Sequence, residues 1–166
     1  MSTSALERDV GGLEYLRRIV AGEMAGVPIG DTLGFRVVGA EPGSVVLAGT
    51  PDARSYNLIG TVHGGWAASI LDTAMALATL ATLDAAHDFT TLDIKVNYLR
   101  PIVPGTAVRA EGRVLHGGRR VALCEAKLVD AAGKLLAHGT GTCLIVPRAG
   151  DRSAGAPRRH ANPSVS

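Results

Sequence analysis

A single carboxylate, Asp72, interrupts an apolar, Ala- and Leu-rich stretch that runs from residue 64 to residue 83. Burying a carboxylate carries a large desolvation penalty, so its presence there calls for either a chemical role or a satisfied structural one. The stretch alone leaves both explanations open. In a chemical role, Asp72 could act as a nucleophile or as a general base.

The triplet His63-Gly64-Gly65 leads from an irregular loop directly into this stretch. If a helix begins there, the N–H groups of its first turn are unpaired and lie at the positive end of the helix dipole. Such donors could hold the oxyanion formed during acyl transfer. The same triplet recurs at residues 116–118, but between two predicted strands, where it indicates only a hairpin turn.

The spacing of Gly64 and Asp72 limits how they could cooperate. Eight residues of helix span about 12 Å, whereas a nucleophile and an oxyanion donor must each lie within about 3 Å of one carbonyl group. If both act on one substrate, Asp72 must therefore come from a second chain. The spacing predicts at least a homodimer with two equivalent sites.

The pattern of apolar residues predicts the elements that position these groups. Residues 5–23 carry the stripe of an amphipathic helix, residues 27–33 indicate a connection, and residues 35–40 and 44–50 indicate a hairpin. Residues 51–62 indicate a loop and residues 64–83 a helix that is apolar nearly all round. Strands are predicted at 91–99, 107–115, 119–129 and 134–145. This order favours an α+β fold with a curled antiparallel sheet around one helix.

Composition excludes several classes of function. The 166 residues include 17 Lys and Arg against 15 Asp and Glu, and four of these arginines fall in the last twenty residues. With six aromatic residues and no basic stripe, nucleic acid is not an expected partner. The five histidines have no metal-binding spacing, and Cys124 and Cys143 form no disulfide framework. We expect no metal, no membrane span and a cytoplasmic location.

Four segments together resemble the hotdog-fold acyl-CoA thioesterases of the phenylacetate-degradation (PaaI) type. They are 57–65 (NLIGTVHGG), 69–74 (SILDTA), 92–94 (LDI) and 98–101 (YLRP). The resemblance covers about residues 33–146 and implies a curved antiparallel sheet wrapped around one long helix. It also implies dimers that join their sheets edge to edge, often assembled into tetramers. The substrate would be an acyl-CoA, and no cofactor would be needed beyond the coenzyme A of the substrate.

The resemblance implies a role for each matched residue. Asp72 matches the nucleophile or general base, and Gly64 matches the donor that polarises the thioester carbonyl from the other subunit. Asn57 matches a residue that positions the thioester or water, and His63 one that supports the carbonyl end of the site. Thr91 matches a position where some relatives hold the water with a hydroxyl, although an ordinary strand threonine fits as well.

Further substrate contacts are expected around these residues. Gly65 and Trp66 follow the oxyanion donor, and Trp66 could line the acyl pocket or simply fill the core. Arg100, Arg119 and Arg120 are candidates for the phosphates of coenzyme A, with solvated surface bases as the alternative.

We expect three parts in the chain: an N-terminal helix and connection at 1–32, the hotdog domain at 33–146 and a basic, disordered tail at 147–166. The predicted activity is hydrolysis of an aryl- or medium-chain acyl-CoA. The sequence leaves open which acyl group is used and whether the assembly is a dimer or a tetramer. Alternatives are a non-catalytic acyl-CoA-binding module and, with less support from the residues, an enoyl-thioester hydratase.

Overall fold

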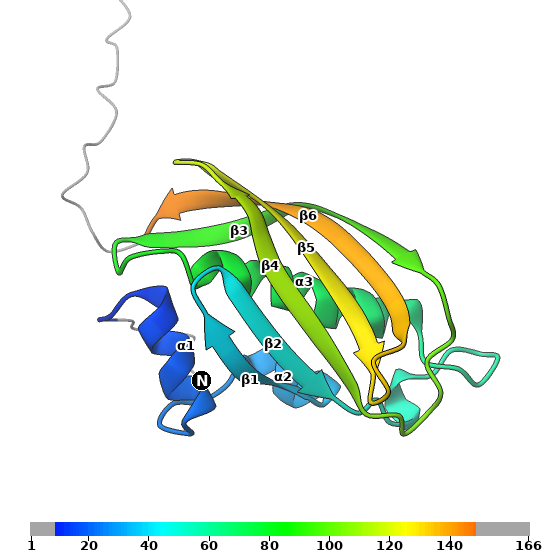
Figure 1. The fold of residues 1–166 in the computed structure, drawn as a ribbon. Helices are drawn as coiled ribbons and strands as arrows, with labels where there is room; N and C mark the ends of the chain where they lie inside the picture. The colour runs from blue at the N-terminus through cyan, green and yellow to red at the C-terminus, as the bar shows by residue number, and fades with distance from the viewer. Residues whose placement is uncertain (1–8, 149–166) are drawn as a thin grey trace, which may run out of the picture.

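The computed structural model of the protein describes residues 9–148. Three α-helices, one short 3-10 helix and six strands follow one another in these residues, and Figure 1 shows their arrangement. In chain order they are α1 (Gly12–Val20), α2 (Pro28–Leu33), β1 (Phe35–Glu41), β2 (Ser44–Gly49), η1 (Ala53–Ser55), α3 (Gly64–Leu80), β3 (His87–Tyr98), β4 (Val108–Gly117), β5 (Val121–Asp130) and β6 (Leu135–Pro147).

The six strands form one antiparallel sheet in the order β1-β2-β4-β5-β6-β3. β3 follows α3 in the chain but pairs with β6, which places it at one edge of the sheet. The sheet curves around α3, as Figure 1 shows. The predicted α+β hotdog fold is confirmed, and all six predicted strands are present with ends shifted by a few residues.

The core lies between α3 and the concave face of the sheet. Ile70 and Leu71 are fully buried, and each such side chain contributes about 1.5–3 kcal/mol relative to its exposed state. The helix packs tightly against β4 at Gly112, where an added Cβ would collide with the carbonyl oxygen of Ala74. Glycine at this position therefore sets how tightly the sheet can wrap the helix.

The N-terminal helix is confirmed over α1. Residues 9–11 and 21–23 of the predicted range are not helical, and residues 5–8 lie outside the described residues. Tyr15 and Leu16 bury the apolar side of α1 in the core, and the Gly12 N–H donates to the Leu83 carbonyl at 2.8 Å. The helix thus packs beside β1 and the end of the α3 segment.

The expectation of a plain connection at residues 27–33 is wrong, because this segment contains the six-residue helix α2. Pro28 fixes the backbone of its first turn, where a missing N–H costs nothing. Gly34 ends the helix with a φ of 74°, a left-handed conformation that glycine adopts without strain. Turn-forming residues here start and stop a short helix.

The sheet leaves one side of α3 uncovered. Every residue of α3 from Thr73 to Leu80 is buried, whereas five residues of its first half are not: Gly64, Gly65, Ala68, Ser69 and Asp72. These five recur at three- and four-residue steps and share one face, which we call the open strip of α3. The prediction that the helix is wrapped on all sides therefore holds only for its second half.

Candidate active site

Asp72 lies at the end of the open strip with its carboxyl group half-buried. The Thr91 hydroxyl, on β3, donates a hydrogen bond to Asp72 Oδ1 at 3.0 Å. Burial raises the pKa of Asp72 above its ordinary value, and the hydrogen bond from Thr91 opposes this shift. The result is a carboxyl group held in one orientation and more basic than an ordinary surface aspartate.

The start of α3 leaves one backbone donor unused. The His63 ring caps the helix, because its Nδ1 accepts a hydrogen bond from the Gly65 N–H at 2.8 Å. The Gly64 N–H has no acceptor among residues 9–148. The cap thus occupies Gly65 and leaves Gly64 as the donor that can meet an oxyanion.

A cavity of about 410 Å³ adjoins this donor, lined by Gly64, Tyr98 and Arg100 among others. The Tyr98 hydroxyl donates to the Gly64 carbonyl oxygen at 3.0 Å, and its ring lies against Gly64. Tyr98 therefore fixes the peptide group at the start of the helix. Sequence reasoning included Tyr98 in the segment 98–101 but assigned it no role, because its contact with Gly64 joins residues 34 positions apart.

The Asn57 side chain organises the loop that precedes the helix. Its Oδ1 accepts from the N–H groups of Ile59 and Thr61 at 3.0 and 3.2 Å, and its Nδ2 donates to Thr61 Oγ1 at 2.8 Å. The tip of this loop carries Leu58, which is fully exposed, and Ile59, which is 83% exposed. Asn57 thus holds a rigid turn that presents two apolar side chains to solvent.

Gly64 and Asp72 lie eight residues apart on one continuous helix, as the spacing argument required. Their backbones are separated by about 12 Å along its axis. One chain therefore does not bring both groups to the same carbonyl carbon. Within one chain, the open strip holds Gly64 and Asp72 too far apart to act on one thioester.

The predicted phosphate contacts lie at two distant places. Arg100 lines the cavity at Gly64 and donates from Nη1 to the Leu135 carbonyl at 2.6 Å. Arg119 and Arg120 lie in the turn between β4 and β5, and the Arg120 carbonyl accepts from the Ile145 N–H. Leu135 and Ile145 are ten residues apart on β6, or about 30 Å. Of these three arginines, Arg100 alone lies close to the donor within one chain.

Trp66 packs in the core and also lines a cavity of about 320 Å³, together with His63, Gly65 and Ser69 among others. It is 4% exposed, its indole N–H donates to the Leu33 carbonyl at 2.7 Å, and its ring meets Phe35 edge to face. The two interpretations that the sequence allowed, a core residue and a pocket wall, are therefore both compatible with the geometry.

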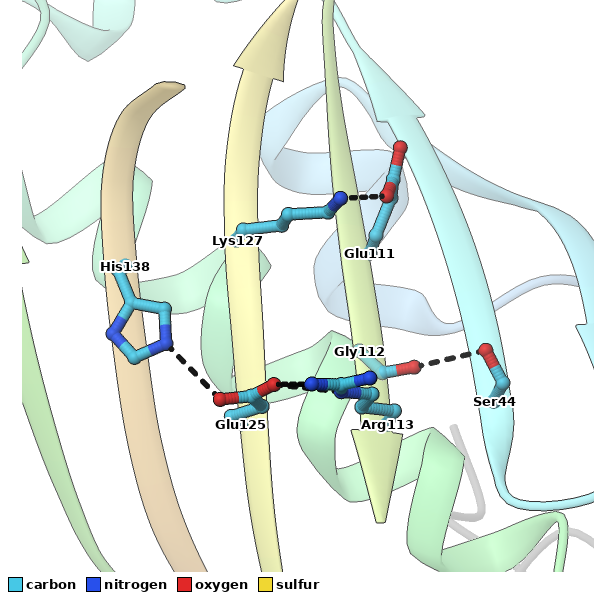
Figure 2. A pocket seen from close by; sticks show the side chains of 7 residues that line it. All are labelled: Ser44, Glu111, Gly112, Arg113, Glu125, Lys127 and His138. Atoms are coloured by element: carbon cyan, nitrogen blue, oxygen red, sulfur yellow. Dashed lines mark hydrogen bonds and ion pairs between the residues drawn. The ribbon is translucent and has the colours of Figure 1, made fainter. Parts of the chain in front are cut away.

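The outer face of the sheet carries a second, polar cavity of about 270 Å³ that sequence reasoning missed (Figure 2). Its lining comprises Ser44, Glu111, Gly112, Arg113, Glu125, Lys127 and His138. The alternation of charged and small residues along β4 was the signal in the sequence from which this cavity could have been predicted. The residues come together only because the sheet order places β2 and β5 beside β4 and β6 beside β5.

The charges in this polar cavity neutralise one another. Lys127 lies 3.0 Å from Glu111, and Glu125 lies between Arg113 at 2.6 Å and His138 at 3.3 Å. Lys127 lowers the pKa of Glu111, and Arg113 lowers the pKa of Glu125. Both acids are therefore held ionised as ion-pair partners, which does not suit a proton-transfer role near neutral pH.

A serine, a histidine and a glutamate share this outer face, but they do not form a catalytic triad. Ser44 lies on β2 and His138 on β6, and two strands separate them. The distance across those strands is about 14 Å, and the Ser44 hydroxyl donates to the Gly112 carbonyl. Asp72 and Gly64 remain the better-supported reactive groups.

The described part of the chain offers neither a metal-binding cluster nor a membrane-spanning helix. Residues 9–148 contain no group of three or more His, Cys, Asp or Glu side chains that could hold a metal ion. None of the helices in these residues is long and apolar enough to cross a membrane.

Comparisons with known proteins point to one family. A family model described as the thioesterase superfamily matches residues 59–137. Human acyl-coenzyme A thioesterase 13 is 32% identical over 107 residues, which cover 64% of this chain and 76% of the relative.

Solved structures agree with this result. A variant of the phenylacetic acid degradation protein PaaI from Thermus thermophilus is 33% identical with a TM-score of 0.66, covering 71% of this chain and 98% of its own. A Streptococcus mutans protein bound to acetyl-CoA is 25% identical with a TM-score of 0.64, covering 69% and 90%. The matched region contains Gly64, Asp72 and Thr91.

Proposed function

The chain belongs to the thioesterase superfamily and is a hotdog-fold thioester hydrolase, and from this premise we propose that it hydrolyses acyl-CoA to a free acid and coenzyme A. The observation that carries the proposal is the pair of groups on α3: a half-buried Asp72 oriented by Thr91 and an unpaired Gly64 N–H. The name of the human relative supports the acyl-CoA thioesterase class, and the name of the Thermus relative connects that protein with phenylacetic acid degradation. The acetyl-CoA bound to the Streptococcus relative supports the ligand.

A thioester is already activated, so two groups suffice for its hydrolysis. Asp72 takes a proton from water as the water oxygen attacks the carbonyl carbon, and the Gly64 N–H of the other subunit binds the resulting oxyanion. Collapse of this intermediate expels the thiolate, which receives the proton from Asp72. The alternative is direct attack by Asp72, which gives an enzyme-bound anhydride that water then cleaves.

Two copies of the chain would complete the site. The open strip of α3 and the edge strand β3 lie on the same border of the molecule, and Ile94, Tyr98 and Leu99 are exposed there. A second copy that covers this border would bring its own Gly64 toward Asp72. We propose a homodimer as the active unit, with a tetramer as a further assembly.

The cavity beside Gly64 supports the proposed acyl class. Its volume of about 410 Å³ lies within the range of small-molecule sites, and its walls include Val62, Leu99 and Ile102. Apolar walls of this kind suit an aryl ring or a medium-length alkyl chain. Arg100 at the same cavity is the proposed contact for a phosphate of coenzyme A.

The test is release of free thiol from a panel of aryl, short, medium and long acyl-CoAs, with wild type beside Asp72→Asn. We expect turnover of at least one aryl or medium-chain substrate and a loss of about 10²- to 10⁴-fold in the variant. Unchanged turnover by Asp72→Asn contradicts the role of Asp72. Binding of acyl-CoA without turnover by the wild type contradicts the enzyme and supports a binding module.

A further inference from the structure

A row of two arginines and an alanine crosses three neighbouring strands of the sheet. Arg36 on β1 is directly opposite Ala48 on β2, and Ala48 is directly opposite Arg109 on β4. Neighbouring strands lie about 4.8 Å apart, so the backbones of the two arginines are about 10 Å from each other. The small side chain of Ala48 leaves the space between the two arginine side chains open.

Both arginines point away from the core. Arg36 lies between Phe35 and Val37, which are 4% and 5% exposed, whereas Arg36 itself is exposed. Arg109 follows the buried Val108, and its side chain is 59% exposed. Because successive side chains of a strand point to opposite faces, both guanidinium groups belong to the outer face of the sheet.

A cavity of about 560 Å³ occupies this part of the outer face and is lined by Arg36, Ala48 and Arg109. The rest of its lining consists of small or apolar residues: Gly34, Gly49, Thr50, Ala107, Val108 and Ala131. Among the described residues, the lining therefore contains two bases and no acid. A volume of this size accommodates a small organic molecule.

The positive charge of the row is only partly neutralised. Arg36 has no acidic partner among residues 9–148. Arg109 lies 2.9 Å from one oxygen of Glu111, but Lys127 lies 3.0 Å from the other oxygen of the same carboxylate. One carboxylate thus serves two bases. The cavity keeps an excess of positive charge, which a bound anion would compensate.

The type of base favours a phosphate group as this anion. A guanidinium group presents pairs of N–H donors in a plane, and these match two oxygens of a phosphate. Two guanidinium groups on opposite sides of one cavity can bind a single phosphate from both sides. The Thr50 hydroxyl also lines the cavity and has no hydrogen-bond partner among residues 9–148, so it offers a further donor.

We propose that this cavity is a phosphate-binding site, in which Arg36 and Arg109 hold one phosphate group of an organic phosphate between them. The site is separate from Gly64 and Asp72, because these residues lie on α3, at the concave face of the sheet. A phosphate of this kind has two sources, the nucleotide end of coenzyme A and a separate phosphorylated molecule.

The first of these sources rests on the proposed function and on the path between two cavities. Ile102 lines the cavity at Gly64, and Ala107 lines the cavity at the arginines. Five residues of chain span at most about 18 Å, so the two cavities are neighbours. Coenzyme A carries its phosphates at the end remote from the thioester, which could lie at the arginines.

Isothermal titration calorimetry with adenosine 3′,5′-bisphosphate as the probe tests the site without any need for turnover. We expect the wild type to bind the probe and Arg36→Gln/Arg109→Gln to bind it at least about tenfold more weakly. Arg36→Lys/Arg109→Lys keeps both charges but loses the paired donors, so its affinity should lie between the two. Arg113→Gln is the matched control, because it removes an exposed arginine from the same strand and face outside the cavity.

The control should bind the probe like the wild type. An equal loss of affinity in Arg113→Gln and in the double glutamine variant would show a response to net surface charge alone and would overturn the site. A wild type that does not bind the probe at millimolar concentration would overturn it as well. Circular dichroism checks that each variant keeps its fold, as expected for changes at exposed side chains.

Kinetics then distinguish the two sources of the phosphate. If it belongs to the substrate, Arg36→Gln/Arg109→Gln should raise KM for acyl-CoA about five- to tenfold with kcat unchanged. An acyl-CoA without its 3′-phosphate should then show the same KM with variant and wild type. If the ligand is a separate molecule, KM should stay unchanged although binding of the probe is lost. An inactive wild type would contradict the proposed function and leave the calorimetric result intact.

Discussion

Burial of the Asp72 carboxyl group disfavours its charged form. Because its pKa is raised in the folded state, the native protein binds more protons than the unfolded chain between the ordinary pKa and the raised one. The contribution of Asp72 to the free energy of unfolding therefore falls as pH rises through this window. At neutral pH the ionised side chain destabilises the fold.

Asp72→Asn should consequently make the protein more stable while it removes turnover. We expect the unfolding temperature at pH 7 to rise by up to about 4 °C. The gain should shrink as pH falls and vanish below the ordinary aspartate pKa, where both side chains are neutral. Thermal unfolding at several pH values checks this, and a variant that is less stable at pH 7 would show that the charge of Asp72 is well compensated.

Thr91 opposes the effect of burial, because its hydrogen bond lowers the pKa of Asp72. Thr91→Val keeps the shape of the side chain and removes the donor. We expect the acid side of the kcat/KM profile to move to higher pH, with activity at pH 8 affected least. Thr91→Ser should leave the profile in place. A profile that is the same for valine and threonine would restrict Thr91 to a packing role.

At the scale of elements, the first turn of α3 offers a direct way to remove the oxyanion donor. Gly64 is the first helical residue, where proline is tolerated, and His63 has φ −63° and ψ 138°, which suit a residue that precedes proline. Gly64→Pro thus deletes the N–H without breaking the helix. Gly64→Ala is the matched control, because both variants add a Cβ about 3.1 Å from the Tyr98 ring.

We expect Gly64→Pro to reduce kcat about 10²- to 10³-fold relative to Gly64→Ala, the usual effect of losing one oxyanion donor. The measurement is steady-state thiol release, with circular dichroism to confirm that the helix is retained. Equal kcat values for the two variants would mean that the Gly64 N–H does not meet the oxyanion.

The periodicity of apolar residues predicted the six strands, α1 and α3. Each of these elements buries either one face or most of its surface. Two features escaped it. α2 depends on capping by Pro28 and Gly34 around only six residues, too few for a period to be visible. The open strip of α3 consists of small residues whose exposure depends on where the sheet stops, which the helix sequence alone does not encode.

At the scale of the whole molecule, some parts of the candidate site could be predicted from the sequence and others could not. Asp72, Gly64 and His63 could be named as candidates from the sequence, because each depends on local features, a lone carboxylate and a helix start. Tyr98 against Gly64 and the outer polar cavity were not, because both join strands through the sheet order. The proposal that a second chain completes the site was available from the sequence, because it follows from the length of a helix alone.

The exposed loop tip gives a prediction for assembly. Leu58 and Ile59 are apolar, almost fully exposed and held on a rigid turn by Asn57, an arrangement that indicates a contact with another molecule. Replacing both with asparagine should weaken the dimer and increase the share of 17.1 kDa monomer at low protein concentration. Analytical ultracentrifugation measures this. A dimer of unchanged affinity would show that the tip lies outside the subunit interface.

In the proposed dimer, each site takes Asp72 from one subunit and Gly64 from the other. Asp72→Asn and Gly64→Pro subunits, co-expressed with different tags, can be purified as a heterodimer. In that heterodimer one site carries both defects and the other carries none, so we predict about half of wild-type turnover per dimer although both parents are inactive. A heterodimer as inactive as its parents would contradict the shared site, because two defective sites result when both groups act within one chain.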